Sequence, residues 1–491
     1  MISFLKFLRF LGPLTLFFAT FVILPPLTMQ AFASEVEIIF LSIFISCLIY
    51  GILIEITLRR KKFIYTPRDG FLITFFGWVF ISILASLPFF FSGMNYADSI
   101  FEAVSGLTTT GSTTISNLSS LSDSLLFYRQ LLQWAGGVGL IIVVLAIIPA
   151  ASGGIRILQA ETSGFAENSF SPRLKKTARS LLRFYLGITI LCAVSYWLAG
   201  MNYFEAISHS FSTVSIGGFS IYDDNFGHFN SPLIEGIAVL FILISATNFG
   251  LHFLFLLKKD FKFYVKNDEF KFFLLLILAA TTFSVLVLLF NEQIGISESF
   301  RYGIFQTISI ITTTGFTITE LDNMGILLPV LIMLLAFVGA CSGSVGGGIK
   351  AWRINILIRL AFDNITKIMH PTAVSTIKFN GEKIEQKQIE SVFSFVAIYV
   401  LIAILFLLAL MLQDIDFYSA FSAVSATLNN LGPGLGQFSD NYSSLEPAGK
   451  ITLSLAMIIG RLEIFGFLLL LFPSFWTVSY THLTLPTTRH V

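Results

Sequence analysis

The chain has 491 residues, of which 55% are hydrophobic and only 12% are charged, and its formal net charge at pH 7 is +1. An average soluble domain carries about 25% charged residues, so this composition excludes an ordinary soluble protein. No Lys- or Arg-rich arm indicates nucleic acid as a partner. The three cysteines fall in apolar segments without paired spacing, so neither a disulfide framework nor a metal site is predicted.

Long apolar stretches predict an all-α protein that crosses a membrane many times. A helix needs about 20 apolar residues to cross the hydrocarbon core. In chain order the predicted spans are 7–29, 36–58, 70–91, 124–150, 178–200, 231–257, 270–290, 325–349, 390–412 and 450–472. The first stretch could be a signal peptide, but Pro25 and Pro26 follow it without an obvious cleavage site, so we interpret it as a retained span.

Four shorter segments lie between these spans, at 97–110, 203–217, 299–314 and 416–431. They are too short to cross a membrane and too apolar to be ordinary loops. Re-entrant half-helices, which enter a membrane and leave it on the same side, have this composition.

The placement of charge predicts the orientation. If the N-terminus is cytoplasmic, 25 of the 30 Lys and Arg residues lie in cytoplasmic connections, as the positive-inside rule demands. The external segments are acidic, and we expect their carboxylates to form a vestibule that concentrates cations. These acids are Asp98, Glu102, Asp123, Glu205, Asp223, Asp224, Glu298, Glu320, Asp322, Asp414 and Asp416.

The four short segments end in related sequences, each closing on a glycine. These glycines are Gly111, Gly218, Gly315 and Gly432, separated by 107, 97 and 117 residues. Each segment lies between two spans, which predicts four membrane–pore–membrane repeats in a pseudo-fourfold arrangement around one pore. The predicted units are a two-helix extension (1–60), repeats at 61–155, 156–260, 261–370 and 371–476, and an atypical tail (477–491).

A half-helix that ends in a glycine turn leaves carbonyl oxygens without intrahelical partners. Four such turns around one axis can replace the water shell of a cation. A single turn of this kind is more often a simple helix cap, but four in register favour an ion filter. The hydroxyls of Thr108, Ser215 and Thr312 would add ligands or brace the turns. The candidate ion-binding residues are Thr108, Thr109, Thr110, Gly111, Ser215, Ile216, Gly217, Gly218, Thr312, Thr313, Thr314, Gly315, Asn429, Asn430, Leu431 and Gly432.

With these four loops the chain resembles the Trk/Ktr/HKT superfamily of bacterial and plant potassium transporters, up to about Trp476. The two extra N-terminal spans resemble the Trk-type membrane subunit. The stretches Gln133–Gly139 and Ala340–Lys350 resemble further family segments. The resemblance implies potassium as the transported ion, because all four filter positions are glycine, whereas some sodium-transporting plant members have serine at the first.

A second glycine-rich stretch, Ala340–Lys350, disfavours continuous helix, since each glycine costs about 1 kcal/mol. Non-helical backbone at membrane depth must be buried in protein or line water. A phosphate-binding loop is excluded because Ile349 separates the glycine from the lysine. The resemblance implies that this loop gates the pore and that an arginine in the last span shapes the barrier to ions. The gate residues are Gly343, Ser344, Gly346, Gly347, Gly348, Lys350 and Arg461.

Several polar residues inside the spans have more than one interpretation. Arg461 would either face the pore or form an ion pair with Glu463 or a vestibule acid. His209 is interpreted as a hydrogen-bonded residue of a half-helix rather than as a proton relay. Asn248 and His252 are interpreted as packing groups.

The resemblance also implies a location and partners. It implies a homodimer in the lipid of the bacterial cytoplasmic (inner) membrane, controlled by a cytoplasmic ring of nucleotide-binding regulatory proteins. Loops 155–178 and 367–388 are the candidate docking surfaces, and no organic cofactor is expected. Residues 477–491 depart from the family and are interpreted as an artefact of sequence assembly.

Four alternatives stay open at this point. A symporter of the same fold would couple potassium to sodium or protons, and a sodium-selective member would differ in its ion. An alternating-access transporter with inverted repeats is disfavoured because the repeats run parallel. A membrane enzyme is disfavoured because the acidic residues are scattered along external segments.

Overall fold

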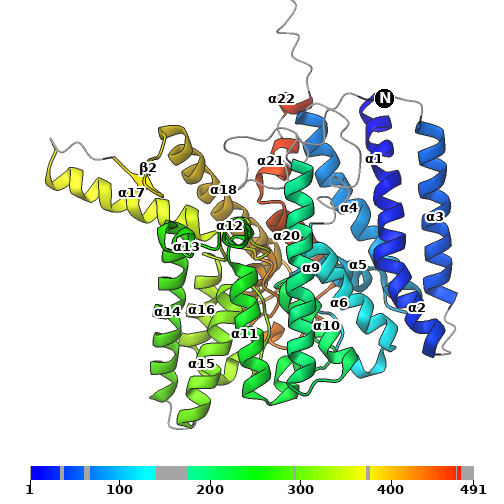
Figure 1. Ribbon diagram of the computed structural model, residues 1–491, viewed down its shortest axis with the longest axis horizontal. Helices are drawn as coiled ribbons and strands as arrows, with labels where there is room; N and C mark the ends of the chain where they lie inside the picture. Colours follow the sequence, from blue (N-terminus) through cyan, green and yellow to red (C-terminus); the bar gives the residue numbers. More distant parts are fainter. Residues whose placement is uncertain are drawn as a thin grey trace, which may run out of the picture.

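The computed structural model describes residues 2–33, 38–59, 63, 67–139, 174–290, 295–371, 376–471 and 473–476. Within these ranges the chain is almost wholly helical (Figure 1). The strands there are β1 (Lys378–Phe379) and β2 (Glu382–Lys383), which pair antiparallel with Lys378 opposite Lys383. Of the sequence predictions, residues 140–173, which include most of one proposed docking loop, and the tail 477–491 lie outside the described residues.

The N-terminal extension consists of two helical rods. The first runs through α1 (Ile2–Phe18), the π-helical turn η1 (Ala19–Ile23) and α2 (Leu24–Ala33), and the second is α3 (Ile38–Leu58). Helix α1 packs against α3 and against the first helix of repeat one. The ion pair between Arg9 and Glu55, with 2.6 Å between Nη1 and Oε2, joins the two rods.

Each repeat has a first helix, a half-helix and a second helix. The first helices are α4 (Pro67–Phe91), α9 (Leu174–Leu198), α14 (Asp268–Leu289) and α18 (Gln386–Met411). The half-helices are α5 (Tyr96–Leu107), α10 (Tyr203–Val214), α15 (Ile296–Ile311) and α19 (Phe417–Leu428). The second helices are α6 (Asp123–Gly137), α11 (Pro232–Ala246), α16 (Leu327–Ala336) and α20 (Pro447–Arg461).

The remaining elements connect these helices. They are the helices α12 (Phe249–Lys258), α13 (Lys262–Lys266), α17 (Ala351–Met369), α21 (Phe465–Leu471) and α22 (Pro473–Trp476), and the 3-10 turns η2 (Leu118–Ser120), η3 (Asn225–Phe229), η4 (Leu321–Met324) and η5 (Gly436–Phe438).

Side-chain caps fix where three of the half-helices begin. The side chains of Asn95, Asn202 and Asp416 accept backbone hydrogen bonds at the starts of α5, α10 and α19, respectively. The donors are the amides of Asp98, Glu205 and Ser419, at 2.9, 2.9 and 3.0 Å. Such caps satisfy amides that a helix cannot pair internally, so these half-helices have defined starting points on the predicted external side.

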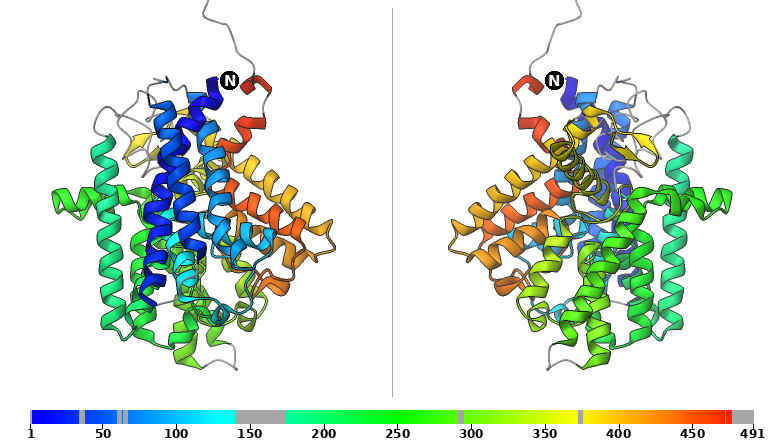
Figure 2. Two further views of the ribbon diagram at one scale, coloured as in Figure 1. Left: turned by 90° about the vertical axis from the view of Figure 1, so that its right-hand side faces the viewer. Right: turned by 90° about the vertical axis from the view of Figure 1, so that its left-hand side faces the viewer.

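The half-helices and second helices form a closed ring. Helix α5 packs against α6, and α6 packs against α10. The contacts continue in the same way through α11, α15, α16 and α19 to α20, and α20 packs against α5. Each second helix therefore lies between its own half-helix and that of the next repeat. The first helix of each repeat packs against its half-helix. The prediction of an all-α fold is confirmed, and Figure 2 shows the helices from two further sides.

Three of the ten predicted spans are not continuous helix, and an interruption was predicted only for the glycine-rich stretch Ala340–Lys350. Among the described residues, six helices are long and apolar enough to cross a membrane, or up to seven if one bent pair counts as a span. The predicted span 231–257 breaks after Ala246 and turns by 92° into α12. The predicted span 325–349 stops at Ala336, and 450–472 breaks at Arg461. Hydropathy averaged over a span does not detect these breaks, because the polar residues and glycines at each break are few within a long apolar run.

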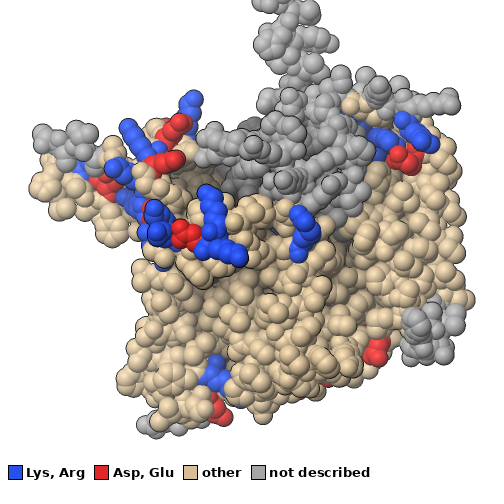
Figure 3. All heavy atoms as spheres, viewed as in Figure 1, with Lys and Arg blue, Asp and Glu red and all other residues tan. Residues whose placement is uncertain are grey.

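Figure 3 shows Lys and Arg side chains gathered toward the end of the molecule where α12, α13 and α17 lie and where α1 begins. The flank below is nearly free of charge in this view. A broad apolar band bounded by a basic rim has the pattern of a protein that spans a bilayer.

Candidate ion pathway

The four half-helices end in the same hydrogen-bonded turn. In each loop, the residue before the key glycine donates its amide to a carbonyl five positions earlier. The pairs are Thr110 to Ser105 (2.9 Å), Gly217 to Ser212 (2.9 Å), Thr314 to Ser309 (2.8 Å) and Leu431 to Ala426 (2.7 Å). The preceding residue donates to the carbonyl three positions earlier, for example Thr109 to Gly106 at 3.0 Å. This is the Schellman arrangement of helix ends, so the sequence repeat is also a repeat of geometry.

Each loop holds two residues in the left-handed backbone region. The key glycines have φ values of 87°, 78°, 83° and 109°, and the residues two positions earlier, Thr109, Ile216, Thr313 and Asn430, have 56°, 55°, 65° and 54°. β-Branched residues rarely adopt positive φ. The backbone of each loop is therefore held in a conformation that few residues adopt.

The key glycines close a ring because each meets the next loop. A side chain on Gly111 would meet the carbonyl oxygen of Gly217 within 3.0 Å, and one on Gly218 would meet that of Thr314. Likewise Gly315 abuts the carbonyl of Leu431, and Gly432 abuts that of Thr110, which returns to the first loop. Any side chain at these positions would displace a backbone carbonyl of the neighbouring loop. The predicted filter residues of all four repeats therefore lie together around one axis.

The side-chain hydroxyls at the start of the loops brace the turns. Thr108 donates to the carbonyl of Val104 at 2.7 Å, and Thr312 donates to that of Ile308 at 2.7 Å. Ser215 donates to the carbonyl of Ser212 at 3.2 Å. These bonds show that the hydroxyls brace the turns; their oxygens keep lone pairs, so the second role considered for them, as ligands, stays a prediction.

Other buried side chains join one loop to another. The Asn430 side chain donates to the hydroxyl of Thr110 at 3.0 Å, and the Ser112 hydroxyl donates to the carbonyl of Gly432 at 2.7 Å. Gln133 on α6 accepts from the amide of Phe219 at 3.1 Å and donates to the carbonyl of Gly217. The sequence motif that includes Gln133 was recognised, but its contact with the second loop was not predictable from the motif alone.

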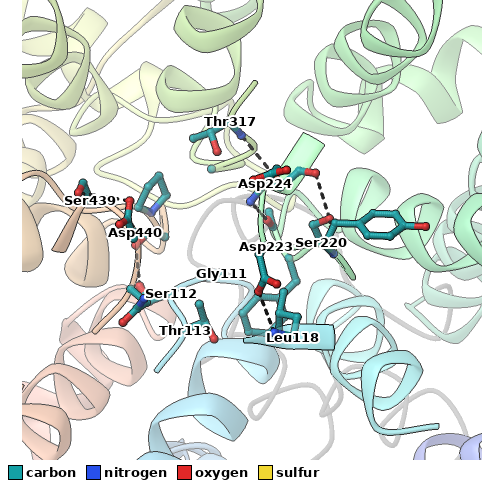
Figure 4. A pocket seen from close by; sticks show the side chains of 18 of the residues that line it. Gly111, Ser112, Thr113, Leu118, Ser220, Asp223, Asp224, Thr317, Ser439 and Asp440 are labelled. Atoms are coloured by element: carbon teal, nitrogen blue, oxygen red, sulfur yellow. Dashed lines mark hydrogen bonds between the residues drawn. The ribbon is translucent and has the colours of Figure 1, made fainter. Parts of the chain in front are cut away.

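A cavity of about 640 Å³ opens at the ring on the predicted external side, and all four key glycines line it. Figure 4 shows part of its lining, with Gly111, Asp223 and Asp440 labelled. Of the predicted vestibule acids, Asp223, Asp224 and Glu320 line the cavity, and Asp440, which the sequence analysis missed, joins them. Carboxylates at a pore mouth raise the local concentration of cations. Asp223 also accepts a hydrogen bond from the amide of Leu118 at 2.7 Å.

Other predicted vestibule acids have structural roles. Glu102 is fully buried and forms an ion pair with Arg129 at 2.7 Å. Arg129 also donates to the carbonyl of Ser220 at 3.1 Å, and its guanidinium lies 4.1 Å from the centroid of the Phe219 ring. Asp98 pairs with Lys450 at 2.7 Å. A buried pair such as Glu102 with Arg129 joins elements distant in sequence, so no local pattern predicted it.

The glycine-rich segment after α16 lies against the opposite ends of the loops. We call residues 337–350 the intramembrane loop. A side chain on Gly347 would meet the carbonyl of Asn429, and one on Gly346 would meet that of Thr312, both within 3.0 Å. The amide of Gly347 donates to the hydroxyl of Thr313 at 2.7 Å. Two of the predicted gate glycines, Gly346 and Gly347, therefore contact the third and fourth filter loops directly.

Arg461 ties this loop to the rest of the pathway. Its guanidinium donates to the carbonyl of Val345 at 2.8 Å and to that of Gly136 at 2.8 Å. A longer contact of 3.4 Å reaches the hydroxyl of Thr109 in the first filter loop. These contacts place Arg461 beside the intramembrane loop and the first filter loop, and its role at a pore stays a prediction. Glu463, its suggested partner, forms an ion pair with Arg353 at 2.6 Å.

Two further contacts, which the sequence analysis missed, hold the intramembrane loop. The Glu269 carboxylate accepts from the amide and hydroxyl of Ser342, at 2.5 and 2.8 Å. At the break between α11 and α12, Cys341 donates its amide to the carbonyl of Ala246 at 3.0 Å. An acid at the start of an apolar helix is the one signal that could have identified Glu269. Lys350, with φ of 81°, donates to the carbonyl of Gly346.

Two polar residues that the sequence singled out, His209 on α10 and Asn248 before α12, have defined contacts. His209 contacts the carbonyl of Glu205 at 2.9 Å and the hydroxyl of Ser220 at 3.0 Å, which confirms its prediction as a hydrogen-bonded residue. Asn248 was interpreted as a packing group, but its side chain accepts from the amide of Gly250 at 2.7 Å and caps α12.

Known proteins match this chain over nearly its full length. The family model described as "TrkH: Cation transport protein" matches residues 37–477. The Trk system potassium uptake protein TrkH of Salmonella typhimurium is 40% identical over 474 residues, which cover 95% of this chain and 98% of that protein. The protein of the same name from Vibrio parahaemolyticus is 40% identical over 482 residues, covering 96% and 99%.

A solved structure matches the whole architecture. The crystal structure of the potassium transporter TrkH from Vibrio parahaemolyticus superimposes with a TM-score of 0.87 at 39% sequence identity, covering 96% of this chain and 100% of that one. Sequence identity at this level over nearly the full length, together with the family model, shows that the chain is homologous to these proteins. The chain belongs to the TrkH family of cation transport proteins.

Proposed function

We propose that this protein takes up potassium ions across the bacterial cytoplasmic membrane through the pore that its four repeats enclose. The observation that carries this proposal is the closed ring of Gly111, Gly218, Gly315 and Gly432, each abutting a backbone carbonyl of the next loop, at the floor of the acidic cavity. The relatives at 40% identity carry potassium uptake in their names, which supports potassium as the cargo.

Selection would rest on the backbone carbonyls of the filter residues Thr108–Gly111, Ser215–Gly218, Thr312–Gly315 and Asn429–Gly432. An ion that enters must shed water, and carbonyl oxygens compensate only if they are held at the right positions. The side chains of Asn430, Ser112 and Gln133 hold the loops against one another. Asp223, Asp224, Glu320 and Asp440 would supply cations to the ring from the external side.

The intramembrane loop and Arg461 would form the gate. The loop lies against the third and fourth filter loops, and the Arg461 guanidinium is bonded to it. A fixed positive charge beneath the filter opposes the passage of a cation. In this proposal the passage opens when the loop, with Gly343, Ser344, Gly346, Gly347, Gly348 and Lys350, withdraws from the filter.

The orientation follows from the basic rim seen in Figure 3, which would face the cytoplasm together with the N-terminus. We infer that the protein works as a homodimer in lipid and that a ring of nucleotide-binding regulatory proteins docks on the cytoplasmic side. Within 367–388, the β1–β2 hairpin and the end of α17 present exposed residues that suit such a contact.

The test is growth of a potassium-uptake-deficient bacterium on low potassium, with the wild type beside Gly111→Ser. The serine side chain would displace the carbonyl of Gly217, so we expect loss of rescue or a sodium leak. Gly236→Ser is the matched control, because nothing lies within 4 Å of a side chain placed there. Equal growth of the wild type, Gly111→Ser and the control would contradict the glycine-ringed pore.

A second measurement separates passive flow from symport. Vesicles that contain the purified protein are loaded with potassium. Uptake of rubidium tracer into them is then measured with and without a sodium or proton gradient. Passive flow predicts uptake driven by the tracer gradient alone. A strict requirement for sodium or protons would instead support the symporter, and preferential sodium uptake would support a sodium-selective member.

A further inference from the structure

The break after α11 turns the chain sideways. Helix α11 ends at Ala246, the Asn248 side chain caps α12, and the axes of α11 and α12 meet at 92°. If α11 crosses the membrane, α12 must run along the membrane plane. Figure 2 shows this green segment standing out sideways from the vertical helices, near the end of the molecule that carries the basic rim.

The outer surface of α12 and α13 combines apolar and basic side chains. Leu256, Leu257, Phe261 and Val265 are 57%, 64%, 68% and 67% exposed. Lys258, Lys259, Lys262 and Lys266 lie between them and are also exposed. Phe261 and Val265 are one helical turn apart, as are Lys262 and Lys266, so the two kinds form adjacent stripes. We call these eight residues the α12–α13 surface.

The lysines of this surface carry net positive charge outward. Among the described residues, none of the four forms an ion pair within 4.0 Å. The nearby acids are engaged elsewhere: Asp260 accepts from the amide of Lys262 at 2.9 Å, and Asp268 pairs with Lys271 and Arg359. The Lys258 ammonium lies 5.1 Å from the centroid of the Phe263 ring.

We propose that the α12–α13 surface binds the headgroups of anionic phospholipids in the cytoplasmic leaflet. A helix in the membrane plane buries large apolar side chains at the boundary between headgroups and acyl chains. Lysines that flank them extend their ammonium groups toward lipid phosphates. The apolar and basic stripes lie side by side on one laterally projecting element. A lipid surface can cover both stripes, whereas a water-soluble protein bound to the lysines would leave the apolar stripe uncovered.

This surface is mechanically joined to the gate. Phe249, the first residue of α12, donates its amide to the carbonyl of Gly343 at 3.1 Å. His252 contacts the carbonyl of Ile244 on α11 at 2.8 Å and the hydroxyl of Tyr264 on α13 at 2.6 Å. A lipid that fixes α12 and α13 therefore fixes the corner that holds the intramembrane loop, so ion flux would depend on the anionic lipid content of the membrane.

The binding test places a reporter on the surface. Full-length protein carrying Phe261→Trp is reconstituted in phosphatidylcholine vesicles that contain either brominated phosphatidylglycerol or brominated phosphatidylcholine. Quenching, measured as the difference from the parent protein, is expected to be stronger with phosphatidylglycerol. Adding Lys259→Gln, Lys262→Gln and Lys266→Gln should weaken this preference by about fivefold for each lysine. The matched control is Lys378→Gln, Lys383→Gln and Lys387→Gln, which removes three exposed lysines elsewhere and should keep the preference.

Three results would overturn the site: equal quenching by both lipids, a preference that survives the three Lys→Gln changes, or no quenching at all, which would indicate that protein such as a second copy covers the surface. No ion flux enters this test, so its failure is distinct from failure of the proposed function. Rubidium uptake with and without phosphatidylglycerol then tests the link to the gate. The link predicts a difference for the wild type that the three Lys→Gln changes abolish, and equal uptake in both vesicles would refute it.

Discussion

The first and second helices of the four repeats differ in length, although both flank the half-helix of their repeat. The first helices α4, α9, α14 and α18 run unbroken for 25, 25, 22 and 26 residues. The second helices α6, α11, α16 and α20 end after 15, 15, 10 and 15 residues. The first helices surround the ring, whereas the second helices form part of it.

The difference teaches where a membrane protein tolerates broken backbone. Lipid offers no hydrogen bonds, so a lipid-facing segment must stay helical. The second helices break where protein supplies the partners: after α16, for example, Ile349 donates to Phe337 at 2.9 Å and Ala351 donates to Ala340 at 3.1 Å. The break after α16 also lies against the candidate filter, since Gly346 and Gly347 abut the carbonyls of Thr312 and Asn429.

The largest expected effect comes from the buried ion pair behind the filter. Arg129→Met on the second helix α6 leaves the Glu102 carboxylate buried without its partner, which costs about 3–5 kcal/mol in the free energy of unfolding. Arg9→Met removes a half-exposed pair in the N-terminal rods and should cost about 0–1 kcal/mol. Unfolding of the purified proteins in detergent by denaturant compares them. Similar losses for both variants would remove the contrast between inner and outer helices.

A smaller effect is expected where the intramembrane loop meets the filter. Gly347→Ala forces a side chain against the carbonyl of Asn429, and overpacking of this kind costs about 1–3 kcal/mol in the closed arrangement. The loop would then withdraw more often, and rubidium uptake into vesicles without a regulatory partner should rise about tenfold. Gly187→Ala on the outer helix α9 is the control, since nothing lies within 4 Å of its new side chain. Unchanged or reduced uptake by Gly347→Ala would argue against a gating loop.

Substitution of Arg461 tests the break at the end of the second helix α20. Arg461→Gln removes the charge and the contacts with Val345 and Gly136, so uptake should rise severalfold. Arg461→Lys keeps the charge but loses the planar fork that reaches two carbonyls, and an intermediate uptake is expected. If both variants behave alike, hydrogen bonding rather than charge sets the barrier.

The smallest effect is expected on the lipid-facing side of a first helix. Leu275 on α14 is 66% exposed, and Leu275→Ala should change the free energy of unfolding by no more than about 0.5 kcal/mol. Phe273 on the same helix is 2% exposed, and Phe273→Ala should cost about 3–5 kcal/mol. The same denaturant measurement compares them, and a large loss for Leu275→Ala would show that protein, rather than lipid, covers this face.

The sequence predicted the parts of the site that are local and repeated. The four glycine turns were found because each is a short pattern between apolar segments, and their ring closure followed from fourfold repetition. The break at Thr247 and Asn248 was not found, because these few polar residues lie between two apolar segments and the break depends on contacts with residues 341 and 343. The Glu102–Arg129 pair and the place of Asp440 at the cavity depend on the tertiary fold alone.

The ring of four glycines belongs to one covalent chain, and its four loops are chemically unequal: Thr108, Ser215, Thr312 and Asn429 occupy equivalent positions. In a pore made of identical subunits, a single codon change alters every quarter of the ring at once. In this chain, a substitution at one position changes one quarter of the ring and leaves the other three as they were.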